Sequence, residues 1–127
     1  MSIPTIFKQA KNYDLIQTTT YNAAIPSWFV SKILKKKCII TFHEYWGNLW
    51  KTLPFLKLYQ RILYRIFEKS ITKLHFTKFI AVSDYTKTSL INAGIPAEKI
   101  IRIYNGLDYE QIQKMAEKII ADLSQMA

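Results

Sequence analysis

The sequence predicts an α/β fold, with a Rossmann-like parallel sheet flanked by helices. Short, nearly continuous apolar runs alternate along the chain with segments whose apolar residues recur at helical spacing. Strands that are continuous in apolar residues are typical of sheets covered on both faces. Because strands and helices alternate, right-handed crossovers would give a parallel sheet with helices on both faces.

The predicted strands are residues 14–18, 38–42, 79–82 and 100–104. The predicted helices between them are residues 22–34, about 54–74, and 84–93, and residues 1–12 resemble the end of a helix that precedes the first strand. Pro54 suits the first turn of its helix, and Ser83 suits an N-cap. Gly94 is typical of a helix end, and Asp108 with Gln111 resembles a capping box that opens a last helix over about 109–124.

Length and composition limit the classes of protein to consider. The chain has 127 residues and is about half apolar, which is enough for one domain with a core. A single cysteine, Cys38, excludes a disulfide framework, and with two histidines no metal site is expected. Neither a membrane-spanning run nor a signal peptide is found in the sequence, so a cytoplasmic location is expected.

The net charge of +9 favours an anionic partner. Nucleic acid, an acidic membrane and a phosphorylated substrate all fit such a charge, and composition does not choose among them.

Polar residues follow each predicted strand. These clusters are residues 18–22, 43–47, 83–84 and 105–106. Since ligands of open parallel sheets bind outside the carboxyl ends of the strands, all four clusters are expected on one rim.

His43 is the strongest single candidate for a functional role. It ends a strand, stands next to Glu44 and precedes Trp46. An imidazole there could position a sugar hydroxyl or a phosphate, or transfer a proton. The alternative is a loop histidine that is hydrogen-bonded to the backbone. Cys38, inside an apolar strand, is expected to be inert core.

The long helix carries a second candidate surface. Lys57, Arg61, Arg65, Lys69 and Lys73 recur at every fourth residue, beside a broad apolar stripe. Like charges at this spacing oppose helix formation, and only Glu68 within the helix could relieve them. Contact with an anionic membrane would relieve them better. The alternative is a solvated face above an ordinary core-packing stripe.

Five segments in order make the chain similar to the amino-terminal domain of family 4 glycosyltransferases, which have the two-domain GT-B architecture. The segments are YDLI (13–16), CIITFH (38–43), FIAVS (79–83), INAGIPAEKI (91–100) and NGLD (105–108). The resemblance implies retaining transfer of a sugar from a nucleotide sugar to an acceptor. It also implies a partial domain, because the family's first strand, its Gly-rich loop and its second domain are not found in the sequence.

The resemblance implies roles for several residues. His43 matches the family histidine that faces the transferred sugar and is the expected catalytic residue. The residues expected on the substrate and acceptor side are Tyr21, Asn22, Glu44, Ser83, Asn105 and Gly106. The basic row of the long helix is the expected membrane-binding surface for a lipid-linked acceptor. No cofactor and no metal is implied, since the nucleotide sugar is a substrate.

We therefore expect residues 1–127 to form a single partial domain that ends in a helix over 109–127. Its expected partners are a nucleotide-binding second domain or subunit, a sugar or lipid-linked acceptor, and an anionic surface on the inner face of the membrane. Without the nucleotide-binding domain or subunit the chain should be inactive. The alternative is a non-catalytic basic module that docks on anionic membrane or on a partner protein. Nucleic-acid binding ranks last, because no base-stacking platform or known reader motif accompanies the basic residues.

Overall fold

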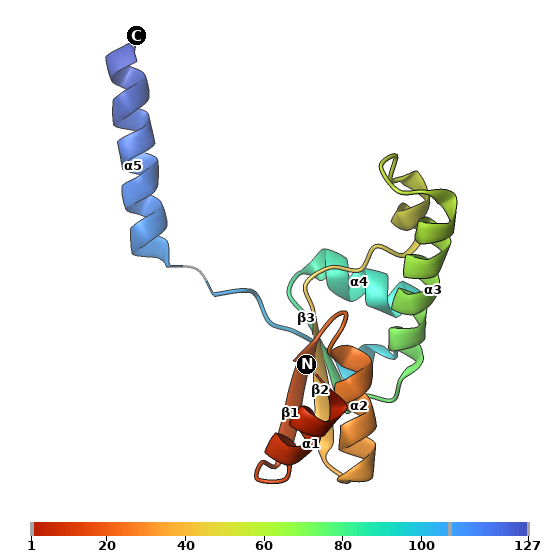
Figure 1. Cartoon of the computed structure of the whole chain (residues 1–127). Helices are drawn as coiled ribbons and strands as arrows, with labels where there is room; N and C mark the ends of the chain where they lie inside the picture. Colours follow the sequence, from red (N-terminus) through yellow and green to blue (C-terminus); the bar gives the residue numbers. More distant parts are fainter. Residues whose placement is uncertain (1, 107, 127) are drawn as a thin grey trace.

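The computed structural model describes residues 2–106 and 108–126, and its centre is one parallel sheet. The strands are β1 (Leu15–Thr19), β2 (Lys37–Phe42), β3 (Lys78–Ala81) and β4 (Ile100–Arg102), in the order β1-β2-β3-β4 (Figure 1). All three strand pairs are parallel. The predicted Rossmann-like α/β fold is thus confirmed, with strand bounds within two residues of those expected.

Helices connect the strands. The α-helices are α1 (Ile3–Ala10), α2 (Ala24–Ile33), α3 (Leu58–Lys73), α4 (Asp84–Asn92) and α5 (Tyr109–Met126), and two short 3₁₀ helices are η1 (Gly47–Thr52) and η2 (Ala97–Lys99). The Ser83 side chain accepts a hydrogen bond from the Thr86 N–H and so caps α4, as predicted. Gly94 follows α4 with a φ of 101°, a conformation that favours glycine and ends the helix.

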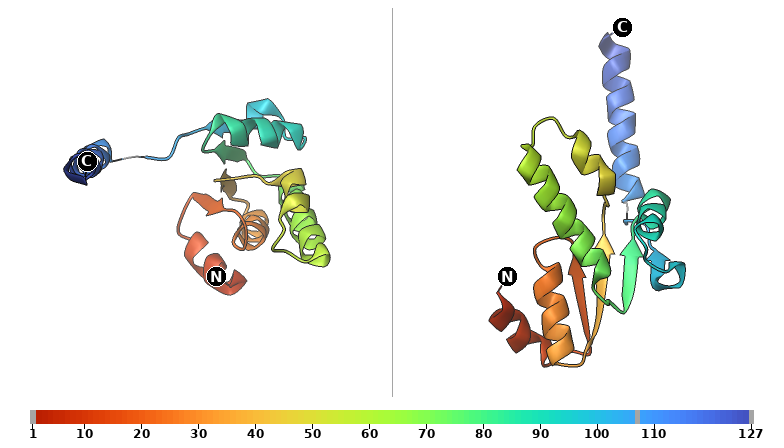
Figure 2. Two further views of the ribbon diagram at one scale, coloured as in Figure 1. Left: turned by 90° about the horizontal axis from the view of Figure 1, so that it is seen from above. Right: turned by 90° about the vertical axis from the view of Figure 1, so that its right-hand side faces the viewer.

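The helices cover one face of the sheet, and the expectation of helices on both faces is wrong. In Figure 1, α2, α3 and α4 all lie to the right of the strands, and Figure 2 shows α2 and α3 in front of the sheet when it is viewed from that side. The strand order explains this. Each strand pairs with the next one along the chain, always in the same direction across the sheet, so every right-handed crossover places its helix on the same face. The other face keeps Leu15 and Ile101 exposed and Ile39 and Ile80 half-buried.

The core lies between the sheet and these helices. Its strand residues include Ile40, Phe42 and Ala81, all fully buried, and the helices contribute Val30 and Leu90. Cys38 is also buried in this core, as predicted, and burial raises the pKa of its thiol to about 11. Burial of such side chains is the main source of stability in a domain of this size.

The long helix begins four residues later than predicted. Pro54 lies in a turn before the helix, because the residue that precedes a proline is driven to extended backbone. Leu53 has a φ of −74° and a ψ of 110°, which ends η1. The chain stays irregular until Lys57, whose extended backbone and N–H bond to Gln60 Oε1 start α3. The η1 helix was not predicted.

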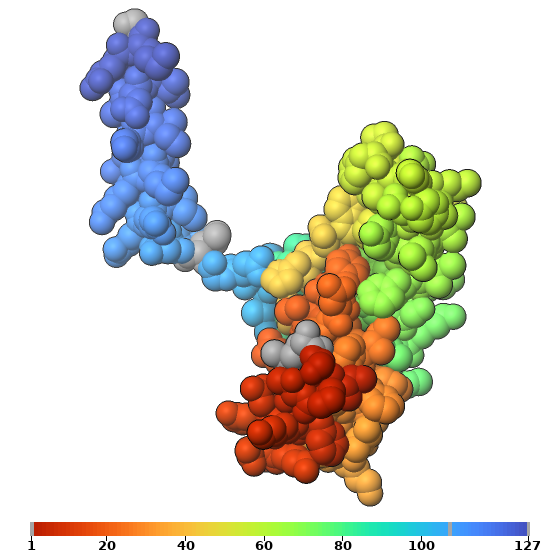
Figure 3. Space-filling view, in the orientation of Figure 1, coloured from red at the N-terminus to blue at the C-terminus, as the bar shows by residue number. Residues whose placement is uncertain are grey.

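The last helix, α5, stands apart from the sheet and has no buried residue (Figure 3). The Gln111 N–H donates to Asp108 Oδ1 at 3.1 Å and so opens α5. An apolar stripe along α5, which includes Ile112, Ile119 and Leu123, is exposed. Within the described residues, none of the helices has the length and apolar character needed to cross a membrane.

Candidate functional site

The loops that follow β2 and β3 form a cavity at the carboxyl rim of the sheet. The cavity has a volume of about 280 Å³ and contains three of the predicted site residues, His43, Glu44 and Ser83. Tyr45, Trp46, Leu49, Tyr85 and Thr86 complete its lining. His43 and Glu44 are exposed to solvent there, whereas Ser83 is half-buried at the N-terminus of α4. His43, Glu44 and the first turn of a helix therefore line one small volume.

The loop that carries His43 is held by Glu68, a fully buried residue of α3. Glu68 Oε1 accepts hydrogen bonds from the Tyr21 hydroxyl at 3.0 Å and from the Trp46 N–H at 2.9 Å. Glu68 Oε2 accepts from the Gly47 N–H at 2.7 Å and from Trp50 Nε1 at 3.0 Å. All four donors are protein groups, which satisfies this buried carboxyl group without a paired cation. Glu68 thus joins the β1 loop, the β2 loop and η1 to α3.

Burial and the nearby Glu68 raise the pKa values of two tyrosines. The pKa of Tyr21 lies well above its ordinary value, mainly because of desolvation and, to a smaller extent, because of the charge and hydrogen bond of Glu68. The pKa of Tyr45 is also raised, mainly by burial and to a smaller extent by Glu68. Both phenols therefore remain protonated, and the Tyr21 hydroxyl remains a donor to Glu68.

Gly47 fits this loop because its backbone has a positive φ, which glycine adopts without strain. Its φ is 49°, and a Cβ at this position would lie 2.9 Å from Tyr45 Cε1. Only glycine adopts this conformation without strain while presenting its N–H to Glu68.

The predicted acceptor-side residues do not all gather in the His43 cavity. Tyr21 and Asn22 line a separate cavity of about 280 Å³, together with Trp50, Tyr64 and Phe67. Asn105 and Gly106 are exposed after β4 and line neither cavity.

Asp84 is engaged at the same rim. Its carboxylate pairs with Arg102 and accepts from the Tyr104 hydroxyl at 3.2 Å. The Arg102 guanidinium, as hydrogen-bond donor, lowers the pKa of Asp84 below its ordinary value. This cluster fixes the first turn of α4 to the end of β4.

The two arginines of the predicted basic row on α3 form hydrogen bonds within the protein, whereas its three lysines are exposed. Arg61 donates to the carbonyl oxygens of Leu56 and Lys51, and Arg65 donates to Asn48 Oδ1 at 2.8 Å. Lys57, Lys69 and Lys73 are exposed. The expectation that Glu68 could relieve the row is wrong, because its carboxyl group is buried among donors from other loops.

The apolar stripe of α3 is also only partly packed. Ile71 is buried and Phe67 half-buried, so the last turns of the helix pack on the core. The side chains towards the N-terminal end are more than half exposed: Phe55, Leu58, Tyr59, Ile62, Leu63 and Ile66. An ordinary core-packing stripe therefore accounts for the last turns only.

Glu68 is the residue of the site that sequence reasoning missed. The sequence shows a single acid in a row of basic residues, which is compatible with a surface ion pair. The one usable signal is its position beside Phe67 and three residues before Ile71, on the buried side of the helix.

In residues 2–106 and 108–126, no group of three His, Cys, Asp or Glu side chains is placed to hold a metal ion.

Comparison with known proteins bears on the family and the fold of the chain. The model of Glycosyltransferase Family 4 matches residues 2–111. Among solved structures, HepE of Anabaena in complex with UDP-glucose matches with a TM-score of 0.64 and 21% identity over 92% of this chain. HepE in complex with UDP and glucose, and with UDP, match with TM-scores of 0.63 and 0.61 and identities of 21% and 22%, each over 92% of this chain. The chain spans 31–32% of the length of HepE in these matches. No curated protein sequence matches significantly.

Proposed function

Because the chain belongs to Glycosyltransferase Family 4, we propose that it supplies the acceptor-side part of an enzyme that moves a sugar from a nucleotide sugar to an acceptor. HepE, with the same fold in the matched region, is described with UDP-glucose bound, which supports a nucleotide-sugar donor. The chain spans only about a third of HepE, so the donor site requires a nucleotide-binding domain or subunit in addition. Neither a cofactor nor a metal takes part in this proposal.

The observation that carries the proposal is the meeting of His43, Glu44 and Ser83 in one cavity at the carboxyl rim. Ligands of parallel sheets bind at this rim. In the proposed reaction the His43 imidazole hydrogen-bonds a hydroxyl of the transferred sugar and holds the sugar in the cavity. Glu44 and the N-terminus of α4 orient acceptor hydroxyl groups, and the aromatic side chains of Tyr45 and Tyr85 offer apolar walls for sugar rings.

We further propose that the basic, apolar end of α3 contacts an anionic membrane, where a lipid-linked acceptor would be presented. The support is that several apolar side chains, among them Phe55, Leu58 and Ile62, are exposed beside the basic row. Helices that lie in a membrane interface have this combination of an apolar face with flanking lysines and arginines. The location that follows is the inner face of a membrane.

The role of His43 is tested by a transfer assay in a protein that also contains the nucleotide-binding domain. We expect His43→Ala to lower kcat by at least about 100-fold, as loss of a positioning or proton-transferring group does. The matched control is His75→Ala, because His75 is the second histidine, is exposed, and lies outside the His43 cavity. Equal activity of the two variants would refute the role of His43.

A non-catalytic module that docks on membranes is the second candidate, and the exposed end of α3 is the observation that favours it. In that case vesicle binding would persist in His43→Ala, and transfer would be undetectable even with a nucleotide-binding domain present.

A further inference from the structure

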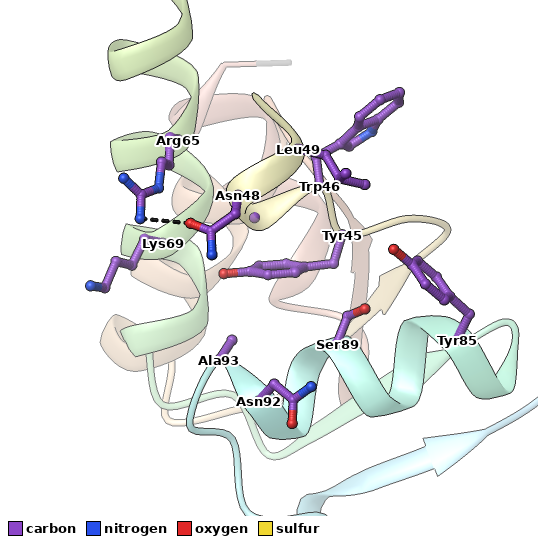
Figure 4. A pocket seen from close by; sticks show the side chains of 11 residues that line it. Tyr45, Trp46, Asn48, Leu49, Arg65, Lys69, Tyr85, Ser89, Asn92 and Ala93 are labelled. Carbon is purple, nitrogen blue, oxygen red and sulfur yellow. Dashed lines mark hydrogen bonds between the residues drawn. The ribbon is translucent and has the colours of Figure 1, made fainter. Parts of the chain in front are cut away.

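A larger cavity lies beside the His43 cavity, between α3, the start of η1 and α4. Its volume is about 380 Å³. It shares Tyr45, Trp46, Leu49 and Tyr85 with the His43 cavity, so the two volumes adjoin along these side chains. Figure 4 shows Arg65 and Lys69 on the α3 side and Ser89 and Asn92 on the α4 side.

The lining of this cavity is positively charged. Arg65 and Lys69 line it, and none of its lining residues is acidic. Glu68, which lies between them in sequence, directs its carboxyl group to Trp46, Gly47, Trp50 and Tyr21 instead. Within the part of the chain that the structure describes, Asp84–Arg102 is the one ion pair, so neither cation of the cavity has a carboxylate partner.

Neutral hydrogen-bonding groups complete the lining. Asn48 Oδ1 accepts from Arg65 Nη2 at 2.8 Å and so fixes the guanidinium at the edge of the cavity. The Ser89 hydroxyl and the Asn92 amide stand on the opposite wall. Two cations on one wall and two neutral polar groups on the other suit an anion with three or more acceptor oxygens, and phosphate is such an anion.

We propose that this cavity binds a phosphate group of the acceptor, with Arg65 and Lys69 as its cationic ligands. The proposal rests on the proposed transfer function, because the cavity is an acceptor subsite only if the sugar is transferred in the adjoining His43 cavity. Acceptor hydroxyl groups would then reach the His43 cavity past Tyr45 and Tyr85, while the phosphate stays on α3. The phosphate can belong to a soluble phosphorylated sugar or to a lipid headgroup.

The first experiment is a titration of the ¹⁵N-labelled chain with phenyl phosphate, followed by amide chemical shifts. We expect the amides of Asn48, Ser89 and Asn92 to shift, and phenyl glucoside, an uncharged probe, to leave them in place. Lys69→Ala should weaken binding about tenfold, which is the effect of losing one charge-assisted hydrogen bond. Lys69 is exposed, so this substitution leaves the fold intact.

The matched control is Lys87→Ala. It removes the same charge from α4 at a position outside the cavity lining, and binding should change by less than about twofold. Equal weakening in Lys69→Ala and Lys87→Ala would mean that only the net charge matters and would overturn the proposal. Identical shifts with phenyl glucoside would overturn it as well.

A second arm separates the two sources of phosphate. Phosphatidylcholine vesicles that contain phosphatidic acid are sedimented with the parent chain, with both variants and with Lys73→Ala. Binding of phenyl phosphate supports a soluble source. Sedimentation that Lys69→Ala weakens more than Lys87→Ala and more than Lys73→Ala, which removes a charge of the same basic row outside the cavity lining, supports a lipid source if phenyl phosphate does not bind. If neither probe depends on Lys69, the subsite is refuted.

These measurements need no donor and no transfer. If phenyl phosphate binds through Lys69 while His43→Ala keeps full activity, the anion site stands and the proposed role of His43 fails. If His43→Ala abolishes transfer while Lys69 has no effect on either probe, the proposed function stands and the phosphate subsite fails.

Discussion

Glu68 Oε2 lies 2.7 Å from the backbone nitrogen of Gly47, and this contact joins the buried side of α3 to the loop that carries His43. Gly47 also has a positive φ, so the loop turns sharply at the residue that donates this bond. With the bonds from Trp46, Trp50 and Tyr21, it makes the loop that carries His43 dependent on a residue far away in sequence.

Glu68→Gln should lower the free energy of unfolding by about 3 kcal/mol. The amide has one acceptor oxygen where the carboxylate has two. Its NH₂ group would therefore face two N–H or O–H donors that now bond to a carboxylate oxygen. In either amide orientation the N–H of Trp46 or of Gly47 loses its acceptor inside the protein, which is costly. Urea denaturation measures the change.

Glu98→Gln is the control for this substitution, because Glu98 is exposed in the short helix η2. It should change the free energy of unfolding by less than about 0.5 kcal/mol. An effect of Glu68→Gln as small as that of Glu98→Gln would show that the four hydrogen bonds do not hold the loop.

Ser83→Ala should cost about 1 kcal/mol of stability, because the Thr86 N–H loses its cap. Ser83→Asp should recover most of this loss, since aspartate caps helices as well as serine does. Thermal unfolding checks both variants. If Ser83 also contacts the acceptor, Ser83→Asp will fold normally and still transfer sugar poorly; a fully active Ser83→Asp would limit Ser83 to capping.

Ile62→Glu should weaken sedimentation with anionic vesicles by at least about fivefold, because it places a negative charge on the exposed apolar face of α3. Ile33→Glu on α2 is a matched control, since Ile33 is 52% exposed and Ile62 is 51% exposed. Neither substitution should reduce stability much. Binding should also fall as salt rises, because the basic row contributes through screened charges.

Equal vesicle binding by Ile62→Glu and Ile33→Glu would contradict membrane contact through α3. Arg61 is a poor choice for this test, because charge reversal there would also break its bonds to Lys51 and Leu56.

Cys38 should react slowly with iodoacetamide in the folded protein. Its pKa is raised from 9.0 to about 11, so its thiolate fraction at pH 8 is roughly 100-fold smaller than in the unfolded chain. Burial slows the reaction further. The measurement compares alkylation rates with and without guanidinium chloride. Comparable rates in the two conditions would show that β2 opens readily.

Much of the local structure was predictable because its signals lie within a few residues. The cap at Ser83 and the stop at Gly94 depend on side chains and backbone preferences of adjacent residues. The apolar strands 38–42 and 79–82 were located because their composition excludes most other structures. The start of α3 was misjudged, since Pro54 suits a helix start and a preceding turn almost equally well.

The site was only partly predictable. The chain order of strands and helices predicted one rim, and His43, Glu44 and Ser83 do meet there. Tyr21 and Asn22 were expected beside them but line another cavity, because the Tyr21 hydroxyl donates a hydrogen bond to Glu68. Neither Asn105 nor Gly106 has a positive φ, and Leu107 of the same segment lies outside the described residues.

The sequence by itself determined the α/β class, the parallel sheet and the family resemblance, because these depend on the order and local composition of segments. Only the tertiary structure decided which face of the sheet is covered, where Glu68 directs its carboxyl group, and which part of the α3 stripe reaches the core. Those features depend on contacts between residues far apart in sequence, such as the bonds of Glu68, whose partners are 18 to 47 positions away, and no local pattern encodes them.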